Sequence, residues 1–147
     1  MDMDKTKNDW EWVIEGQLAR GGRPGRRECG ESVVPQSIVG EWTDELWEAG
    51  IRSVICLLDD EQLTRYYPDL DLLACYQAQG MESCRIPTRD FQDPPLSMRD
   101  LERIWRAWLQ LPKPVLIHCC AGVSRTGRAV SFIKGRLIPV ETSRARK

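Results

Sequence analysis

One stretch of the chain holds the residue types that phosphoryl transfer to a thiol requires. It reads HCCAGVSRTG from His118 to Gly127, so that five residues separate Cys119 from Arg125. A cysteine attacks as its thiolate, whereas the pKa of free cysteine is near about 8.5, so the surroundings must favour the ionised sulfur. A loop that curls from a strand into a helix N-terminus aims backbone N–H groups and the helix dipole at one point. The pattern therefore predicts an anion-binding loop around Cys119.

The same loop suits a phosphate dianion, because helix N-termini bind phosphate groups. Gly122 allows the backbone to curl without obstruction from a side chain. Arg125 can turn back toward the sulfur and grip two phosphate oxygens with its planar guanidinium. We therefore expect Cys119 and Arg125 to converge on one phosphate.

The segment HCCAGVSRTG resembles the HC-x-x-G-x-x-R-S/T-G loop of dual-specificity phosphatases, in the cysteine-dependent protein tyrosine phosphatase superfamily. WVIEGQLARGGRP is similar to the N-terminal strand pair of small atypical members of that group. GIRSVICLL and RIPTRDFQDPP are similar to the strand and the general-acid loop that precede the cysteine loop. The resemblance covers about residues 10–137 and implies a hydrolase, a cysteine-based protein phosphatase.

The resemblance implies a role for each residue of the loop. Cys119 would attack phosphorus and form a phosphocysteine intermediate, and Thr126 would hydrogen-bond the sulfur so that it departs as a thiolate. His118 would orient the loop by hydrogen bonding. The phosphate would be held by Arg125 and by the backbone N–H groups of Cys120, Ala121, Gly122, Val123 and Ser124. No metal ion or other cofactor is expected, because the arginine and the amides supply the electrostatics.

The leaving oxygen needs a proton, which a carboxylic acid on a loop can supply. Two aspartates, Asp90 and Asp93, lie in the loop before the cysteine segment. The family pattern of an aspartate, an aromatic residue and then prolines aligns best with Asp90 and Phe91. Asp90 is therefore the predicted general acid, and Asp93 is the alternative.

The surrounding sequence alternates helical patterns with short apolar runs. Strands are expected on both sides of Gly16 within residues 10–19, at 51–58, at 82–86 and at 114–120. Helices are expected at 41–49, 69–79, 97–109 and 125–137, with Leu109 and Leu137 among the core positions. The Gly-, Pro- and Arg-rich segment 19–32 is expected to be a loop. The order predicts an α/β fold with a central, mostly parallel sheet flanked by helices, similar to dual-specificity phosphatases.

The sequence predicts a flexible end at residues 1–9, a phosphatase-like domain at 10–138 and a polar, basic tail at 139–147. In this 147-residue chain only 22 residues follow Arg125, and Pro139 stops the helix that begins there. The helices that follow the loop in related domains are therefore expected to be shortened or missing, as in a truncated product. We expect one face of the sheet to be partly uncovered as a result.

The composition of the chain limits the kinds of partner that we expect it to bind. The net charge of −1 gives no general electrostatic reason to bind nucleic acid, and no apolar run is long enough to span a membrane. The polar, acidic start of the chain does not look like a secretion signal, and six cysteines without paired spacing suit reduced thiols in the cytoplasm. One histidine and scattered cysteines give no zinc-ligand spacing. Because the loop lacks lysine, the expected substrate is a protein phosphorylated on tyrosine, or also on serine or threonine, with a small phosphorylated metabolite as the alternative.

Three other hypotheses remain open at this stage. The loop could hold phosphorylated partners with little or no turnover, as a pseudophosphatase does. The same thiolate could serve sulfur transfer or arsenate reduction. A thiol on a neighbouring strand, Cys56 or Cys84, could trap oxidised Cys119 as a disulfide, since an unstrained bridge to the adjacent Cys120 is badly placed.

Overall fold

A computed structural model describes residues 10–90 and 92–137 of the chain. The strands are β1 (Trp10–Ile14), β2 (Leu18–Gly21), β3 (Ser53–Cys56), β4 (Glu82–Arg85) and β5 (Val115–His118). The helices are α2 (Arg26–Cys29), α3 (Gln36–Glu48), α4 (Asp60–Tyr66), α5 (Leu72–Gln79), α6 (Met98–Gln110) and α7 (Ser124–Leu137).

The five strands form one sheet in the order β1-β2-β5-β3-β4. Only β1 and β2 run antiparallel, and the other three pairs are parallel. All four residues of β3 and all four of β5 are buried, as expected for central strands of a parallel sheet that is covered on both faces. The predicted mostly parallel α/β fold is confirmed.

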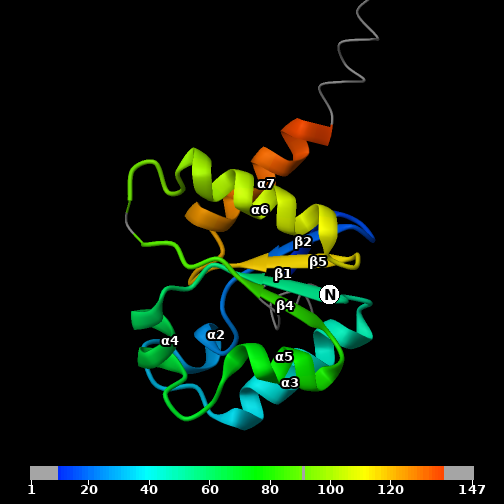
Figure 1. Cartoon of the computed structure of the whole chain (residues 1–147). Helices are drawn as coiled ribbons and strands as arrows, with labels where there is room; N and C mark the ends of the chain where they lie inside the picture. The colour runs from blue at the N-terminus through cyan, green and yellow to red at the C-terminus, as the bar shows by residue number, and fades with distance from the viewer. Residues whose placement is uncertain (1–9, 91, 138–147) are drawn as a thin grey trace, which may run out of the picture.

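Helices cover both faces of this sheet, with α6 and α7 on one side and α2 to α5 on the other (Figure 1). The α7 side chains Ala129, Val130 and Ile133 are buried in one apolar cluster with Ile117 of β5. The opposite cluster includes Leu116, together with buried side chains of α3 and α5. Among the described residues, the central strands β3 and β5 are buried on both faces, whereas the edge strands β1 and β4 are only partly buried.

Most predicted elements are present, although several boundaries differ. Residues 19–32 are not all loop, because β2 extends through Gly21 and α2 forms a single helical turn. Helix α3 begins at Gln36, earlier than predicted, and α4 was not predicted at all. Leu109 and Leu137 are exposed rather than part of the core. Ser97 and Asp100 form a capping box at the start of α6, in which each side chain accepts a hydrogen bond from the other's backbone N–H.

The predicted flexible end 1–9, Phe91 and the predicted tail 139–147 lie outside the described residues. Within the described residues, no helix is both long and apolar enough to cross a membrane.

Candidate active site

The cysteine segment leaves the carboxyl end of β5 and enters α7, as the sequence predicted. Cys119 and Arg125 line the same cavity, whose volume is about 620 Å³. Ala121, Val123 and Ser124 also line it. The backbone N–H of Gly122 donates a hydrogen bond to Sγ of Cys119 at 3.2 Å. The loop therefore already directs one main-chain donor at the sulfur, which favours negative charge there.

Gly122 is required at its position for two reasons. Its φ angle is +78°, in the left-handed region that L side chains rarely adopt. In addition, a Cβ atom would lie 2.5 Å from the carbonyl carbon and oxygen of Gly21, which is shorter than real contacts. The close approach of the β2 end to the cysteine loop is held by a hydrogen bond from the N–H of Arg23 to the carbonyl of Cys120, 2.9 Å long. The guanidinium of Arg20 also donates to the carbonyl of Gly122 at 2.7 Å.

Arg125 is almost completely buried, with 2% of its side chain exposed. Its Nη1 donates to the carbonyls of Leu57 at 3.2 Å and Thr88 at 3.0 Å, and to Oε1 of Gln62 at 3.3 Å. Leu57 follows β3 and Thr88 follows β4, so the carboxyl ends of two parallel strands fix the guanidinium. Because Nη1 is occupied, the donors that suit an anion in the cavity are those on Nε and, beside Oδ2 of Asp90 at 3.4 Å, those on Nη2.

The two candidate acids occupy different positions. Asp90 lines the cavity, and its Oδ2 lies 3.4 Å from Nη2 of Arg125. Asp93 is exposed and is not among the described residues that line the cavity. The structure thus brings Asp90, rather than Asp93, together with Cys119 and Arg125.

His118 lies fully buried beneath the loop in a chain of hydrogen bonds. Its Nε2 is 2.8 Å from the hydroxyl of Tyr76, which accepts from Nε1 of Trp42 at 3.2 Å. Its Nδ1 is 3.3 Å from the carbonyl of Cys119, an acceptor only. Nδ1 therefore carries the proton, and Nε2 accepts from the tyrosine. This neutral tautomer supports the proposal that His118 orients the loop.

Burial lowers the pKa of His118 from its ordinary 6.5 to about 4; the hydrogen bond to the Cys119 carbonyl opposes this shift, and the nearby Arg125 charge adds to it. The histidine in the folded protein thus stays neutral between pH 6.5 and 4, whereas in the unfolded chain it takes up a proton. The neutral His118 therefore makes its full contribution to the free energy of unfolding above pH 6.5. This contribution is lost as the pH falls, by up to about 1.4 kcal/mol per pH unit.

We therefore expect the NMR signals of the ring protons of His118, the chain's single histidine, to show no titration near pH 6.5 in the folded protein. Urea unfolding at several pH values should show the free energy of unfolding decreasing from pH 7 toward pH 5. A histidine ring that titrates near pH 6.5 without unfolding would contradict the buried, neutral assignment.

One expected contact is missing. The hydroxyl of Thr126 is buried and has no hydrogen-bond partner among the described residues. The predicted hydrogen bond from Thr126 to Cys119 is therefore not formed in this structure. The side chain still lies in the first turn of α7, directly after Arg125, with no accessible surface.

All six cysteines are free thiols, so Cys119 is not joined to Cys56, Cys84 or Cys120. Burial raises the pKa of Cys56 to about 11, with the nearby charge of Arg85 lowering it by less. Burial also raises the pKa of Cys84. Both groups therefore favour the protonated, less reactive form.

Several residues of the site were not predicted. Gln62 and Thr88 hydrogen-bond Arg125, and Tyr76 hydrogen-bonds His118, each from more than 35 positions away in the chain. Only Gln62 carried a local signal, since Asp59 and Gln62 have the spacing of a capping box. Thr88 and Tyr76 give no such pattern, because their contacts depend on strand pairing and on the packing of α5 against the sheet.

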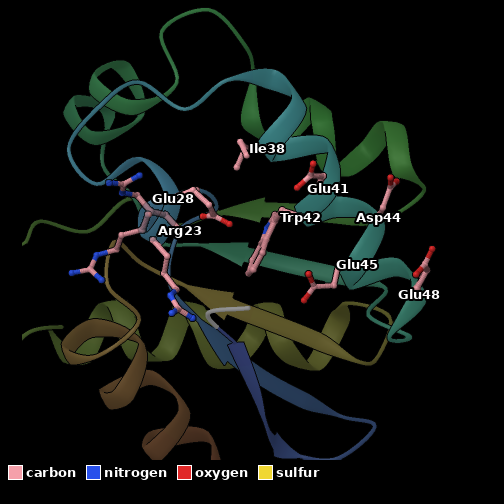
Figure 2. Close-up of a pocket in the computed structure, with 11 residues that line it drawn as sticks. Arg23, Glu28, Ile38, Glu41, Trp42, Asp44, Glu45 and Glu48 are labelled. Carbon is pink, nitrogen blue, oxygen red and sulfur yellow. The ribbon is translucent and has the colours of Figure 1, made fainter. Parts of the chain in front are cut away.

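A second cavity of about 400 Å³ lies between α2 and α3 (Figure 2). Its wall includes four carboxylates of α3: Glu41, Asp44, Glu45 and Glu48. The buried guanidinium of Arg23 reaches this cavity. It stacks on the ring of Tyr66 and donates Nη2 to the carbonyl of Gly30, whereas its Nε and Nη1 have no hydrogen-bond partner among the described residues. Arg26 and Arg27 also line this cavity, but five carboxylates, those four and Glu28, outnumber the three arginines and disfavour a phosphate dianion there. In the described part of the chain, no group of three acidic, cysteine or histidine residues could hold a metal ion.

Comparison with protein families finds a match over most of the described chain. The model described as "Tc-R-P: Polymorphic toxin system, DSP-PTPase phosphatase" matches residues 29–135, more than half of the chain. The matched range contains Asp90, Cys119 and Arg125. No curated protein sequence matches the chain significantly.

Solved structures share the fold. A DUF442 protein of Shewanella putrefaciens CN-32 has a TM-score of 0.60 at 23% identity, over 86% of this chain and 68% of that one. Kinase-associated phosphatase, with its catalytic-site cysteine replaced by serine, has a TM-score of 0.63 at 21% identity, over 79% and 63%. PTPMT1 in complex with PI(5)P has a TM-score of 0.57 at 17% identity, over 86% and 71%. At these identities the likeness shows the fold, and the chain spans less than two thirds of kinase-associated phosphatase.

Proposed function

The chain belongs to the DSP-PTPase phosphatase family of polymorphic toxin systems, within the cysteine-based phosphatase superfamily, and we propose that it hydrolyses phosphate monoesters through Cys119. One observation carries this proposal: Cys119, Arg125 and Asp90 line a single cavity at the carboxyl edge of the sheet. A nucleophile, an anion-binding guanidinium and a proton donor are the three groups that the reaction needs.

In the first step, the thiolate of Cys119 attacks phosphorus while the bond from phosphorus to the leaving oxygen breaks. Arg125 and the loop amides hold the three remaining phosphate oxygens, on which charge gathers in the transition state. Asp90, in its protonated form, gives its proton to the leaving oxygen. The products are an alcohol or phenol and a phosphocysteine on Cys119.

In the second step, a water molecule attacks the phosphocysteine. The Asp90 carboxylate takes a proton from this water, the phosphorus–sulfur bond breaks, and Cys119 departs as a thiolate. Inorganic phosphate leaves, and Asp90 is protonated again for the next cycle. No atom of the enzyme is consumed.

The substrate class is part of the proposal. The cavity carries a mixed lining that includes Arg26, Arg65 and Arg89 beside Glu31 and Glu61, which suits a phosphopeptide with charged neighbours of either sign. A protein phosphorylated on tyrosine, or also on serine or threonine, is therefore the proposed substrate. PTPMT1 was solved with a phosphoinositide, and this lipid class and small phosphorylated metabolites are the comparison substrates for a test panel. A reducing compartment such as the cytoplasm is proposed, because the reaction needs Cys119 as a free thiolate.

A second function is favoured by the unpartnered Thr126 hydroxyl. Without a hydrogen bond to the departing sulfur, hydrolysis of the phosphocysteine would be slow, and the domain would act mainly as a binder of phosphorylated partners. Measuring vanadate-sensitive turnover of 4-nitrophenyl phosphate beside phosphopeptide affinity separates the two functions. Multiple turnovers support the enzyme, whereas tight binding with no more than one turnover supports the binder.

Replacing Asp90 by asparagine should reduce turnover of phenyl phosphate by about 10²-fold, because the poor leaving group then departs without a proton. The phosphate contacts of Arg125 remain, so the inhibition constant of inorganic phosphate should change little. Steady-state kinetics of Asp90→Asn and of the matched control Asp93→Asn would measure this. Equal losses in the two variants, or a loss only in Asp93→Asn, would remove Asp90 from the role of general acid.

A further inference from the structure

Gln62 contacts both Arg125 and Asp90, whose side chains also lie 3.4 Å apart in a direct ion pair. It is half-buried in the first turn of α4 and lines the same cavity as Cys119. Its Oε1 accepts from Nη1 of Arg125 at 3.3 Å, and its Nε2 donates to Oδ2 of Asp90 at 3.2 Å. One amide thus contacts both the guanidinium that would hold phosphate and the carboxyl that would supply the proton.

The orientation of this amide is fixed by its neighbours. A guanidinium can only donate, so the amide oxygen must face Arg125, and the amide NH₂ then faces the Asp90 carboxylate. The capping box of α4 adds to this: Oε1 of Gln62 also accepts from the N–H of Asp59 at 3.3 Å, and Oδ1 of Asp59 accepts from the N–H of Gln62 at 2.8 Å. Two donors at one oxygen prevent the amide from turning over.

We propose that Gln62 is a positioning residue that holds Arg125 and Asp90 in their working arrangement; this inference rests on the proposed phosphatase function. The start of α4 fixes the position of the Gln62 amide. Through its two hydrogen bonds, the amide in turn holds the side chains of Arg125 and Asp90. The hydrogen bond from Nε2 of Gln62 keeps the Asp90 carboxyl within the cavity in both steps.

The loss of Gln62 should therefore have two separate consequences. Arg125 loses a fixed acceptor, so inorganic phosphate should bind about three- to tenfold more weakly, which corresponds to one hydrogen bond. Asp90 loses its anchor, so reactions that depend on proton donation should slow more than those that do not. Phenyl phosphate depends on it strongly, whereas 4-nitrophenyl phosphate releases a stable anion and depends on it little.

The test compares Gln62→Ala with Asp100→Ala. For each variant, kcat and KM are measured with phenyl phosphate and with 4-nitrophenyl phosphate, and the inhibition constant of inorganic phosphate is measured as well. Asp100 is a matched control, because it holds the same capping-box position in α6 and lies outside the cavity lining. Both variants remove a capping side chain and should lose similar stability, about 1 kcal/mol. Gln62→Met, which keeps the side-chain volume but neither polar contact, provides a second variant if the alanine protein does not fold.

For both Gln62 variants we expect the ratio of kcat for 4-nitrophenyl phosphate to kcat for phenyl phosphate to rise about tenfold, with weaker phosphate inhibition. Asp100→Ala should keep the wild-type ratio and inhibition constant. If either the ratio or the inhibition constant of the Gln62 variants matches that of Asp100→Ala, the bridging role is overturned. A wild-type protein without turnover would instead overturn the proposed function, so the two failures are distinguishable.

Discussion

Replacing Cys119 by serine should abolish turnover, with a loss of about 10³-fold or more for any phosphate monoester. A serine hydroxyl does not ionise near neutral pH, so the group that attacks phosphorus is removed while its size is nearly kept. The Arg125 guanidinium and the loop amides remain, so the variant should still bind phosphate. Steady-state kinetics and the binding of a phosphotyrosine peptide by calorimetry would measure both consequences.

The matched control is Cys75→Ser, a half-buried cysteine of α5 that lies outside the cavity lining. It should keep the wild-type rate. Turnover by Cys119→Ser at a rate within tenfold of the wild type would contradict the proposed nucleophile, because a water-based mechanism would then be sufficient.

Replacing Arg125 by lysine should reduce kcat/KM by about 10²- to 10³-fold, even though the positive charge is kept. Lysine has no planar fork, so it cannot donate to two phosphate oxygens in the plane of the guanidinium. It also lacks the Nη1 donor that the carbonyls of Leu57 and Thr88 accept from, and these buried carbonyls would lose a partner. The loss should therefore appear in both the rate and the stability.

Arg128→Lys serves as the control, because Arg128 lies one residue beyond Gly127 on the same helix and donates its Nε to the carbonyl of Leu96. It should retain most of the activity. If Arg125→Lys and Arg128→Lys lose equal activity, then the guanidinium of Arg125 has no special role at the phosphate.

The loop was predictable from the sequence because its chemistry is local. Cys119, Gly122 and Arg125 lie within one strand–loop–helix unit, so their spacing alone places the sulfur and the guanidinium near the same helix N-terminus. The buried strands β3 and β5 were predictable for a similar reason, since short β-branched runs bounded by glycine or proline suit the centre of a parallel sheet.

The supports of the loop were not predictable, because they come from distant segments. Thr88 reaches Arg125 only because β4 pairs with β3, and Tyr76 reaches His118 only because α5 packs on the opposite face of the sheet. No periodicity in the sequence records those pairings. The absent bond between Thr126 and Cys119 has a different cause: sequence similarity specifies the residue but not the direction of its hydroxyl.

The central claim is that phosphate passes through a covalent bond to the sulfur of Cys119. Rapid mixing with 4-nitrophenyl phosphate, denaturing quench within the first turnover and mass spectrometry of the digested protein would test it most directly. We predict one phosphoryl group on the peptide that contains Cys119, and none on that peptide in Cys119→Ser. Continued release of nitrophenol with an unmodified Cys119 at every time point, or a phosphoryl group on another residue, would contradict the account.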